Sequence, residues 1–125
     1  MAGAAATSST ESKVFTDLLE QLPILHEATT SRVVLNNELV RYVLFSFDAG
    51  QLLTEHASPK AVVVQLLSGS MEFTVAGESS VLSAGDIVYL APGARHALTA
   101  IEPCRMALTM VDVLLTLSSQ SWRGR

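Results

Sequence analysis

Four glycines recur at an interval of eight residues in the middle of the chain: Gly69, Gly77, Gly85 and Gly93. Short apolar runs lie between them, and the last glycine is followed closely by His96. Turn residues about every eight to twelve positions between short apolar runs are typical of an antiparallel β-sandwich or barrel. Glycine suits such turns because it adopts positive φ without a steric penalty. The spacing therefore predicts an all-β fold.

The composition limits the size and the partners of this fold. A chain of 125 residues allows one domain with a core of its own. Apolar residues make up 49% of the chain and charged residues 16%, so we expect part of the apolar surface to lie in a subunit interface. The net charge of -4 and the lack of a long basic cluster argue against nucleic-acid binding.

Cys104 is the single cysteine, so no intrachain disulfide is expected, and a reducing compartment fits. The N-terminus lacks the basic and apolar regions of a secretory signal. The longest late apolar run, residues 106–117, is interrupted by Asp112 and is too short to span a membrane. We therefore expect a cytoplasmic protein with no membrane partner.

The sequence divides into four parts. Residues 1–11 are small and polar and are predicted to be a disordered N-terminus. Residues 12–30 are predicted to hold a short amphipathic helix, ended by Pro23, and a linker. Residues 31–117 are predicted to form the β-barrel domain, and residues 118–125 a loose C-terminal tail. The helix is expected because apolar side chains recur every three or four positions, at Val14, Phe15, Leu18, Leu19 and Leu22.

Apolar runs and turn residues predict the strands of the barrel domain. One of them, residues 61–67, has Gln65 as its only polar residue, so both of its faces are expected to be buried. A second subunit on the outer face would explain this, and we therefore expect a homodimer. The predicted strands cover residues 31–35, 38–47, 51–56, 61–67, 71–75, 81–82, 87–90, 96–101 and 105–111, the last extending to 117.

Two groups of residues resemble the two sequence motifs of the cupin family. Gly50, His56 and Gly69 stand in the order of the first motif, and residues 85–86 and 93–96 in the order of the second. The resemblance implies an all-β, antiparallel jelly-roll barrel (a double-stranded β-helix), here with a short N-terminal helix. It also implies a pocket at the centre of the barrel and, in many members, a dimer.

The family usually holds a metal with two histidines one residue apart, a glutamate, and a third histidine from the second motif. His56 matches the first histidine and His96 the third, whereas Ser58 and Val62 occupy the two other positions. The resemblance therefore implies half of the usual metal site.

A metal at this site would need further ligands. Imidazole suits zinc, iron, copper and nickel, and the expected cofactor is a divalent transition metal: Zn, Fe, Ni or Mn. Gln65 is a candidate third ligand by type, but strand alternation directs it away from Val62 unless a bulge intervenes. Glu55 has the same difficulty beside His56. The alternative is that His56 and His96 are hydrogen-bonded pocket residues that bind no metal.

Apolar side chains with a few polar groups also describe a pocket for a small molecule. Strand alternation predicts the side chains that line it together with the two histidines: Tyr42, Leu44, Val62, Val64, Phe73, Leu98 and Met106. Gln65 is added to the predicted lining as a polar group that a bulge would turn inward.

Three functions remain open at this point. The first is a protein that binds a small molecule, and with it a divalent metal, in the barrel. The second is a metal-dependent enzyme, an oxygenase or isomerase, that uses a reduced His56/His96 centre. The third is a structural or dimerisation module.

Overall fold

The computed structural model describes residues 6–112. These residues form nine β-strands and no helix. The described part of the chain therefore offers no helix that could cross a membrane. The strands are β1 (Thr29–Asn36), β2 (Val40–Phe47), β3 (Leu52–His56), β4 (Ala61–Ser68), β5 (Ser70–Val75), β6 (Glu78–Ser83), β7 (Ile87–Leu90), β8 (His96–Ala100) and β9 (Cys104–Val111).

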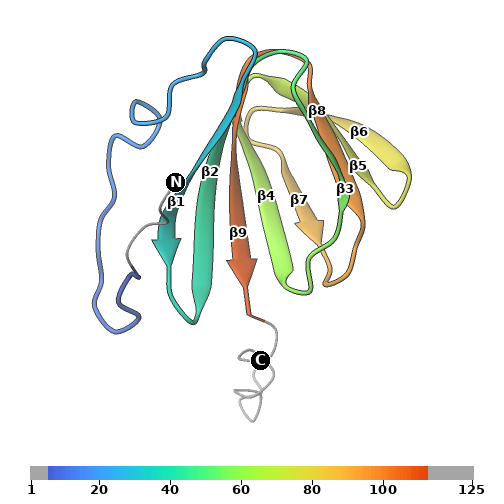
Figure 1. Cartoon of the computed structure of the whole chain (residues 1–125). Helices are drawn as coiled ribbons and strands as arrows, with labels where there is room; N and C mark the ends of the chain where they lie inside the picture. The colour runs from blue at the N-terminus through green and yellow to red at the C-terminus, as the bar shows by residue number, and fades with distance from the viewer. Residues whose placement is uncertain (1–5, 113–125) are drawn as a thin grey trace.

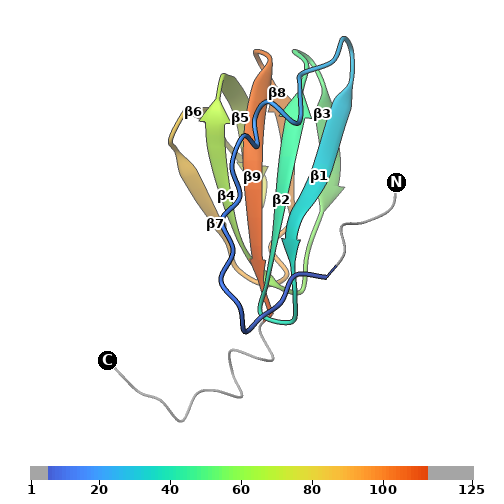
Figure 2. The ribbon, with the colours of Figure 1, turned by 90° about the vertical axis from the view of Figure 1, so that its left-hand side faces the viewer.

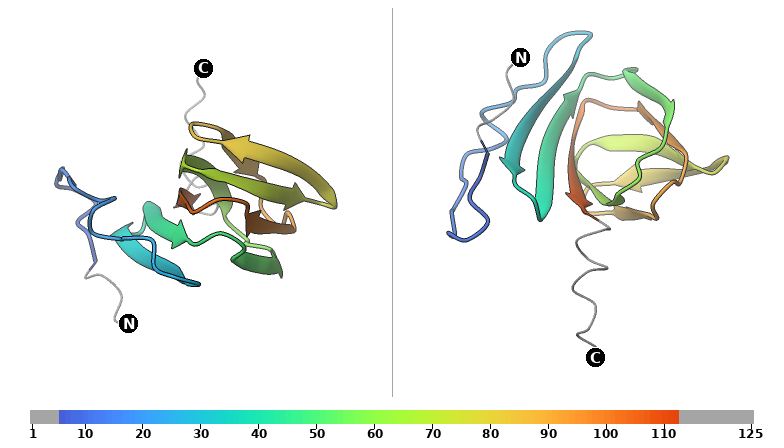
Figure 3. Two further views of the ribbon diagram at one scale, coloured as in Figure 1. Left: turned by 90° about the horizontal axis from the view of Figure 1, so that it is seen from above. Right: turned by 60° about the horizontal axis from the view of Figure 1, so that its bottom comes forward.

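The strands form two antiparallel sheets. One has the order β1-β2-β9-β4-β7 and the other the order β3-β8-β5-β6. The two sheets face each other (Figure 1) and enclose a barrel that is seen nearly end-on in Figure 3. This arrangement confirms the predicted all-β jelly-roll barrel.

The core lies between the two sheets and is built from alternate residues of each strand. The large buried side chains between the sheets are apolar and come from both sheets. They belong to one continuous cluster, whose members include Phe47, Leu66, Met71, Phe73, Leu90 and Met106.

The repeated glycines occupy the turns that their spacing predicts, since all four have positive φ. Gly69 is constrained by its surroundings as well. A Cβ atom at this position would lie only 2.6 Å from the Cβ atom of Cys104 and would also meet the carbonyl oxygen of Pro103. Glycine therefore allows the β4–β5 turn to pack directly on the start of β9.

The helix predicted within residues 12–30 is wrong. Residues 12–17 form no regular secondary structure, and one turn follows, in which the Gln21 N–H donates to the carbonyl oxygens of Asp17 and Leu18. A helix this short is only marginally stable by itself. The sheet offers the apolar side chains a surface that does not require helical periodicity, and they pack on it from an irregular chain.

Residues 12–22, here called the strap, run across the outer face of the five-stranded sheet (Figure 2). The Leu22 carbonyl oxygen accepts hydrogen bonds from Ser46 Oγ at 2.6 Å and from Arg105 Nε at 3.3 Å. These bonds tie the end of the strap to β2 and β9. Its apolar side chains pack in a second cluster that contains Phe15, Leu18, Leu22, Val34, Leu44 and Ala107.

The chain before the strap also contacts the barrel. The Thr7 N–H donates to the carbonyl oxygen of Asn36 at 2.7 Å, at the end of β1. The predicted disorder of residues 1–11 and the predicted domain boundaries remain predictions. The extension of the last strand through residue 117 and the loose tail at 118–125 lie outside the described residues.

Strand β4 differs from the prediction that both of its faces are buried. Its inward residues Val62, Val64 and Leu66 are buried, whereas 39% of Val63 is exposed on the outer face. Gln65 is also exposed there. Within one chain the strap covers the β1-β2-β9 part of the outer face and the end of β4 at Leu67. It leaves β7 and the part of β4 around Val63 uncovered.

Candidate metal and ligand site

An irregularity in β3 directs His56 into the barrel. Leu53 pairs with Leu98 of β8, and His56 pairs with His96, so two residues of β3 between these pairs lie opposite a single residue of β8. The extra residue is a β-bulge. Without it, strand alternation would place Leu53 and His56 on opposite faces, but here both face the interior.

The second histidine is placed by the turn before β8. The Gly93 N–H donates to the carbonyl oxygen of Ser58 at 2.7 Å, which joins this turn to the loop after β3. The Ala94 N–H donates to the carbonyl oxygen of Ala91 at 3.0 Å and closes the turn. His96 is the first residue of β8 and therefore starts directly opposite His56.

The two imidazole rings lie together, with centroids 4.2 Å apart and planes inclined by 59°. His56 Nδ1 lies 3.1 Å from the carbonyl oxygen of Thr54, and His96 Nδ1 lies 3.1 Å from that of Ala94. A ring nitrogen bonded to a carbonyl must carry the hydrogen, so Nε2 of each neutral ring carries the lone pair. Metal-binding histidines commonly have this second hydrogen bond, which fixes the tautomer and the ring orientation.

His96 is the buried member of the pair, with 6% of its surface exposed. The ring of Phe73 stacks on it, at a centroid distance of 6.0 Å. Burial lowers the pKa of His96 below its usual value of 6.5. The charge of His56 lowers this pKa further, whereas the bond to the Ala94 carbonyl raises it. The ring is therefore neutral at pH 7, as metal binding requires.

A cavity of about 50 Å³ adjoins the histidine pair. Four of the side chains predicted to line the pocket do line this cavity, namely Val64, Phe73, Leu98 and Met106. The prediction missed four others: Phe45, Leu53, Ala97 and Leu108. Leu53 was missed because a bulge leaves no sequence signal that simple alternation detects.

The prediction that the pocket is also lined by Tyr42, Leu44 and Gln65 is wrong. These three side chains lie on the outer face of the sheet. Leu44 and Tyr42 belong to the cluster under the strap, where burial raises the pKa of the Tyr42 hydroxyl. Gln65 is exposed, and its Nε2 donates to the carbonyl oxygen of Gly85 at 3.4 Å. Val62 is buried on the inner face but does not line the cavity.

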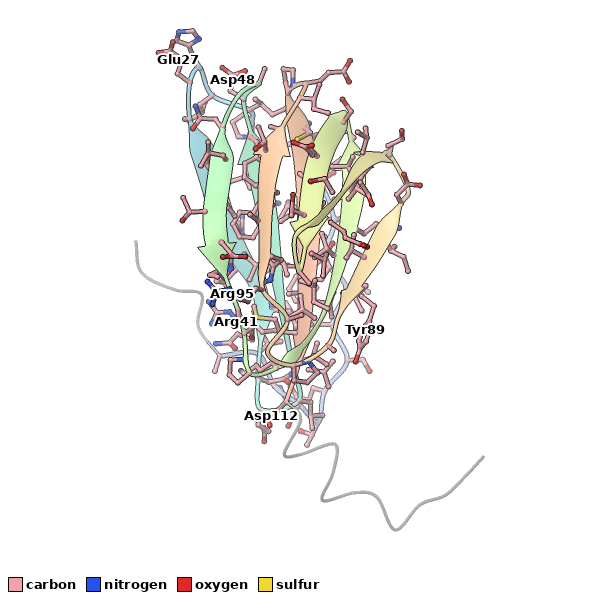
Figure 4. All side chains as sticks on the ribbon, turned by 90° about the vertical axis from the view of Figure 1, so that its right-hand side faces the viewer. Glu27, Arg41, Asp48, Tyr89, Arg95 and Asp112 are labelled. Carbon is pink, nitrogen blue, oxygen red and sulfur yellow. The ribbon has the colours of Figure 1, made fainter. Side chains whose placement is uncertain are left out.

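No third protein ligand accompanies the two histidines in the described part of the chain, where no three His, Cys, Asp or Glu residues gather. The nearest carboxylate in sequence, Glu55, forms an ion pair with Arg95, with Oε1 and Nη2 2.9 Å apart. The hydrogen bond from Arg95 lowers the pKa of Glu55. Figure 4 shows Arg95 at the same end of the barrel as Arg41, opposite the end that carries Asp48.

A family model described as a cupin domain matches residues 43–113. The chain belongs to the cupin family. This confirms the resemblance seen in the two glycine and histidine motifs. Among curated proteins, none has a significantly similar sequence.

Solved structures agree with the cupin fold. A conserved protein of unknown function from Streptococcus pyogenes is 28% identical, with a TM-score of 0.74, over 87% of this chain and 96% of that one. An RmlC-like cupin from Desulfovibrio desulfuricans is 20% identical, with a TM-score of 0.72, over 80% and 97%. A putative mannose-6-phosphate isomerase from Ralstonia eutropha is 17% identical, with a TM-score of 0.71, over 81% and 100%. At these identities the last two likenesses concern the fold alone.

Proposed function

We propose that this cupin binds a divalent transition metal through Nε2 of His56 and Nε2 of His96, together with a small molecule at the barrel cavity. The observation that carries the proposal is the pairing of the two rings at 4.2 Å, with both Nδ1 atoms bonded to backbone carbonyls. The donor chemistry fits Zn, Fe, Ni or Mn, the metals expected for imidazole with oxygen ligands.

The chain's own residues prepare this site for a metal. The bulge in β3 holds His56 opposite His96, and burial keeps His96 neutral. Apolar side chains line the cavity beside the two rings. When bound, the metal would act as a Lewis acid toward an oxygen of the small molecule.

Metal binding can be measured by elemental analysis and by calorimetric titration of the purified protein with Zn²⁺ and Ni²⁺. We expect one ion per chain in the wild type and its loss in both His56→Gln and His96→Gln. His26→Gln is the matched control, because 86% of the His26 side chain is exposed in a loop away from the site. Equal metal content in the wild type and both site variants would refute the proposal.

The alternative function is a metal-dependent enzyme of the isomerase or oxygenase type that uses the same centre. It is supported by the open positions that two protein ligands leave on a metal and by the fold shared with the putative mannose-6-phosphate isomerase. Turnover of sugar phosphates, or oxygen uptake, by the metal-loaded protein and not by His96→Gln would favour it. Binding without turnover would favour the first function.

We also propose that the protein is a cytoplasmic homodimer, with the uncovered part of the outer face as its interface. Ile87 and Tyr89 of β7 are 61% and 62% exposed there, next to Val63, and the side chains of this patch carry no charge that would repel a second copy. Light scattering should give a dimer for the wild type and a monomer for Ile87→Lys. Val81→Lys, on the other sheet and 66% exposed, should remain a dimer. A monomeric wild type would refute this proposal.

A further inference from the structure

We infer that the protein has a second ligand site, between the strap and strand β1, that takes a small organic anion: a carboxylate or phosphate group joined to an apolar ring or chain. The site is a cavity of about 540 Å³, lined by residues from the segment 6–21 and from β1. Pockets that enclose small molecules measure roughly 300 to 1,000 Å³. Figure 1 shows this segment on the side of the barrel away from β3 and β8, which carry the two histidines.

Hydrogen bonds at both ends of the segment define the walls of the cavity. At the first end the Thr7 N–H donates to the carbonyl oxygen of Asn36 at 2.7 Å, and the Asn36 N–H donates to Thr7 Oγ1 at 3.1 Å. At the other end the Leu22 carbonyl oxygen is bonded to β2 and β9. Between these points, in the part of the chain that the structure describes, no hydrogen bond between backbone atoms joins residues 8–21 to the sheet. Space for a ligand therefore remains between the strap and β1.

Two cations line this cavity without a carboxylate partner. They are Lys13 of the strap and Arg32 of β1, and the three ion pairs found among residues 6–112 involve neither of them. Glu11 also lines the cavity but forms no ion pair with either cation. Two positive charges against one negative charge leave the lining positive, although the whole chain has a net charge of -4. An anion is therefore favoured at this place.

The guanidinium of Arg32 is held in position by the strap. Its Nη1 donates to Oε1 of Gln21, and Nε2 of Gln21 donates to the carbonyl oxygen of Thr16 at 3.3 Å. A guanidinium has five N–H donors in a planar fork, and the fork suits the two oxygens of a carboxylate or phosphate. Since the bond to Gln21 fixes the group without neutralising it, Arg32 is the expected primary contact of the anion.

The rest of the lining indicates an apolar portion of the ligand. Phe15, Leu18 and Val34 belong both to the cluster under the strap and to the cavity lining. Lys13 Nζ lies 5.2 Å from the centroid of the Phe15 ring, so a cation and an apolar surface adjoin. An inorganic anion would leave this surface uncovered, and a neutral apolar molecule would leave the two cations unpaired. A molecule with both parts satisfies both requirements.

Titration of the full chain followed by ¹H–¹⁵N NMR tests the inference, with benzoate, phenyl phosphate and benzamide as probes. Benzoate and benzamide are similar in size and shape, but only benzoate is charged. We expect benzoate to bind about tenfold more tightly than benzamide, as a hydrogen bond to a charged group allows. The backbone amide resonances of the strap and β1 should shift, and those of β3 and β8 should not. The tighter of benzoate and phenyl phosphate identifies the anionic group.

Three charge-removing variants identify the contacts. Arg32→Gln should weaken benzoate binding about tenfold, and Lys13→Gln about threefold, because its ammonium is exposed. Lys60→Gln is the matched control, since it removes the same charge from a residue outside the cavity lining, and it should bind benzoate like the wild type. Arg32 is exposed as well, so these variants should fold, which circular dichroism would verify.

Several results would overturn this site. They are equal affinities for benzoate and benzamide, unchanged benzoate affinity in both Arg32→Gln and Lys13→Gln, shifts confined to β3 and β8, or no binding of any probe at millimolar concentration. Because the titrations contain no added metal and the site shares no residue with the histidine pair, these results would leave the proposed metal site untouched.

Discussion

The strap provides a quantitative prediction, because its leucines differ sharply in their contacts. Leu22 of the strap is 9% exposed and packs with Leu44 and Ala107 of the sheet, whereas Leu19 is 40% exposed. Truncation of a buried leucine costs about 2 to 5 kcal/mol. Because Leu22 lies at the rim of a small cluster, we expect Leu22→Ala to cost about 2 kcal/mol, at the lower end of this range. Leu19→Ala should cost less than about 1 kcal/mol.

Thermal and urea denaturation followed by far-ultraviolet circular dichroism would measure both variants. For a domain of this size, a loss of 2 kcal/mol corresponds to a fall in Tm of roughly 6 to 10 °C. Val14→Ala is a further control, because Val14 is 84% exposed and its truncation should leave Tm unchanged. Equal losses for Leu22→Ala and Leu19→Ala would refute the non-helical strap, since an amphipathic helix would bury both side chains.

Three further predictions concern single residues. Gly69→Ala should destabilise the protein much more than Gly77→Ala, as measured by urea denaturation. Both glycines have positive φ, but only at Gly69 would the added Cβ atom collide with neighbouring atoms. Cys104 is buried, and burial raises the pKa of its thiol to about 11, so a thiol reagent should modify it only after denaturation. His96 has a lowered pKa in the folded state, so the unfolded chain binds the proton first as the pH falls. The free energy of unfolding of the metal-free protein should therefore decrease below about pH 6.5, and less so in His96→Gln.

Much of the fold could be predicted from the sequence because the turns are marked by residues with special backbone needs. The glycines at intervals of eight place the turns between β4 and β8, and the short apolar runs between them place the strands. His56 and His96 were found together because each belongs to a sequence motif that carries a fixed place in the barrel. Their pairing in β3 and β8 agrees with that prediction.

The remaining features depend on contacts that a periodicity does not contain. In β2, residues of both parities are apolar, so alternation did not reveal that Phe45 faces the cavity and Tyr42 faces the strap. The bulge in β3 reverses the alternation between Leu53 and His56. The strap has helical spacing, but the partners of its apolar side chains lie on a sheet, and these tertiary contacts override the local preference.

Histidine ring NMR tests the proposed metal site most directly. Long-range ¹H–¹⁵N spectra of uniformly labelled protein report the state of each ring nitrogen during titration with Zn²⁺. We expect the resonances of Nε2 of His56 and Nε2 of His96 to shift together as Zn²⁺ binds. Both Nδ1 atoms should remain protonated and hydrogen-bonded to their backbone carbonyl oxygens. The ring resonances of His26 should not shift. A response of only one of the two rings, or coordination through Nδ1, would contradict the proposed site.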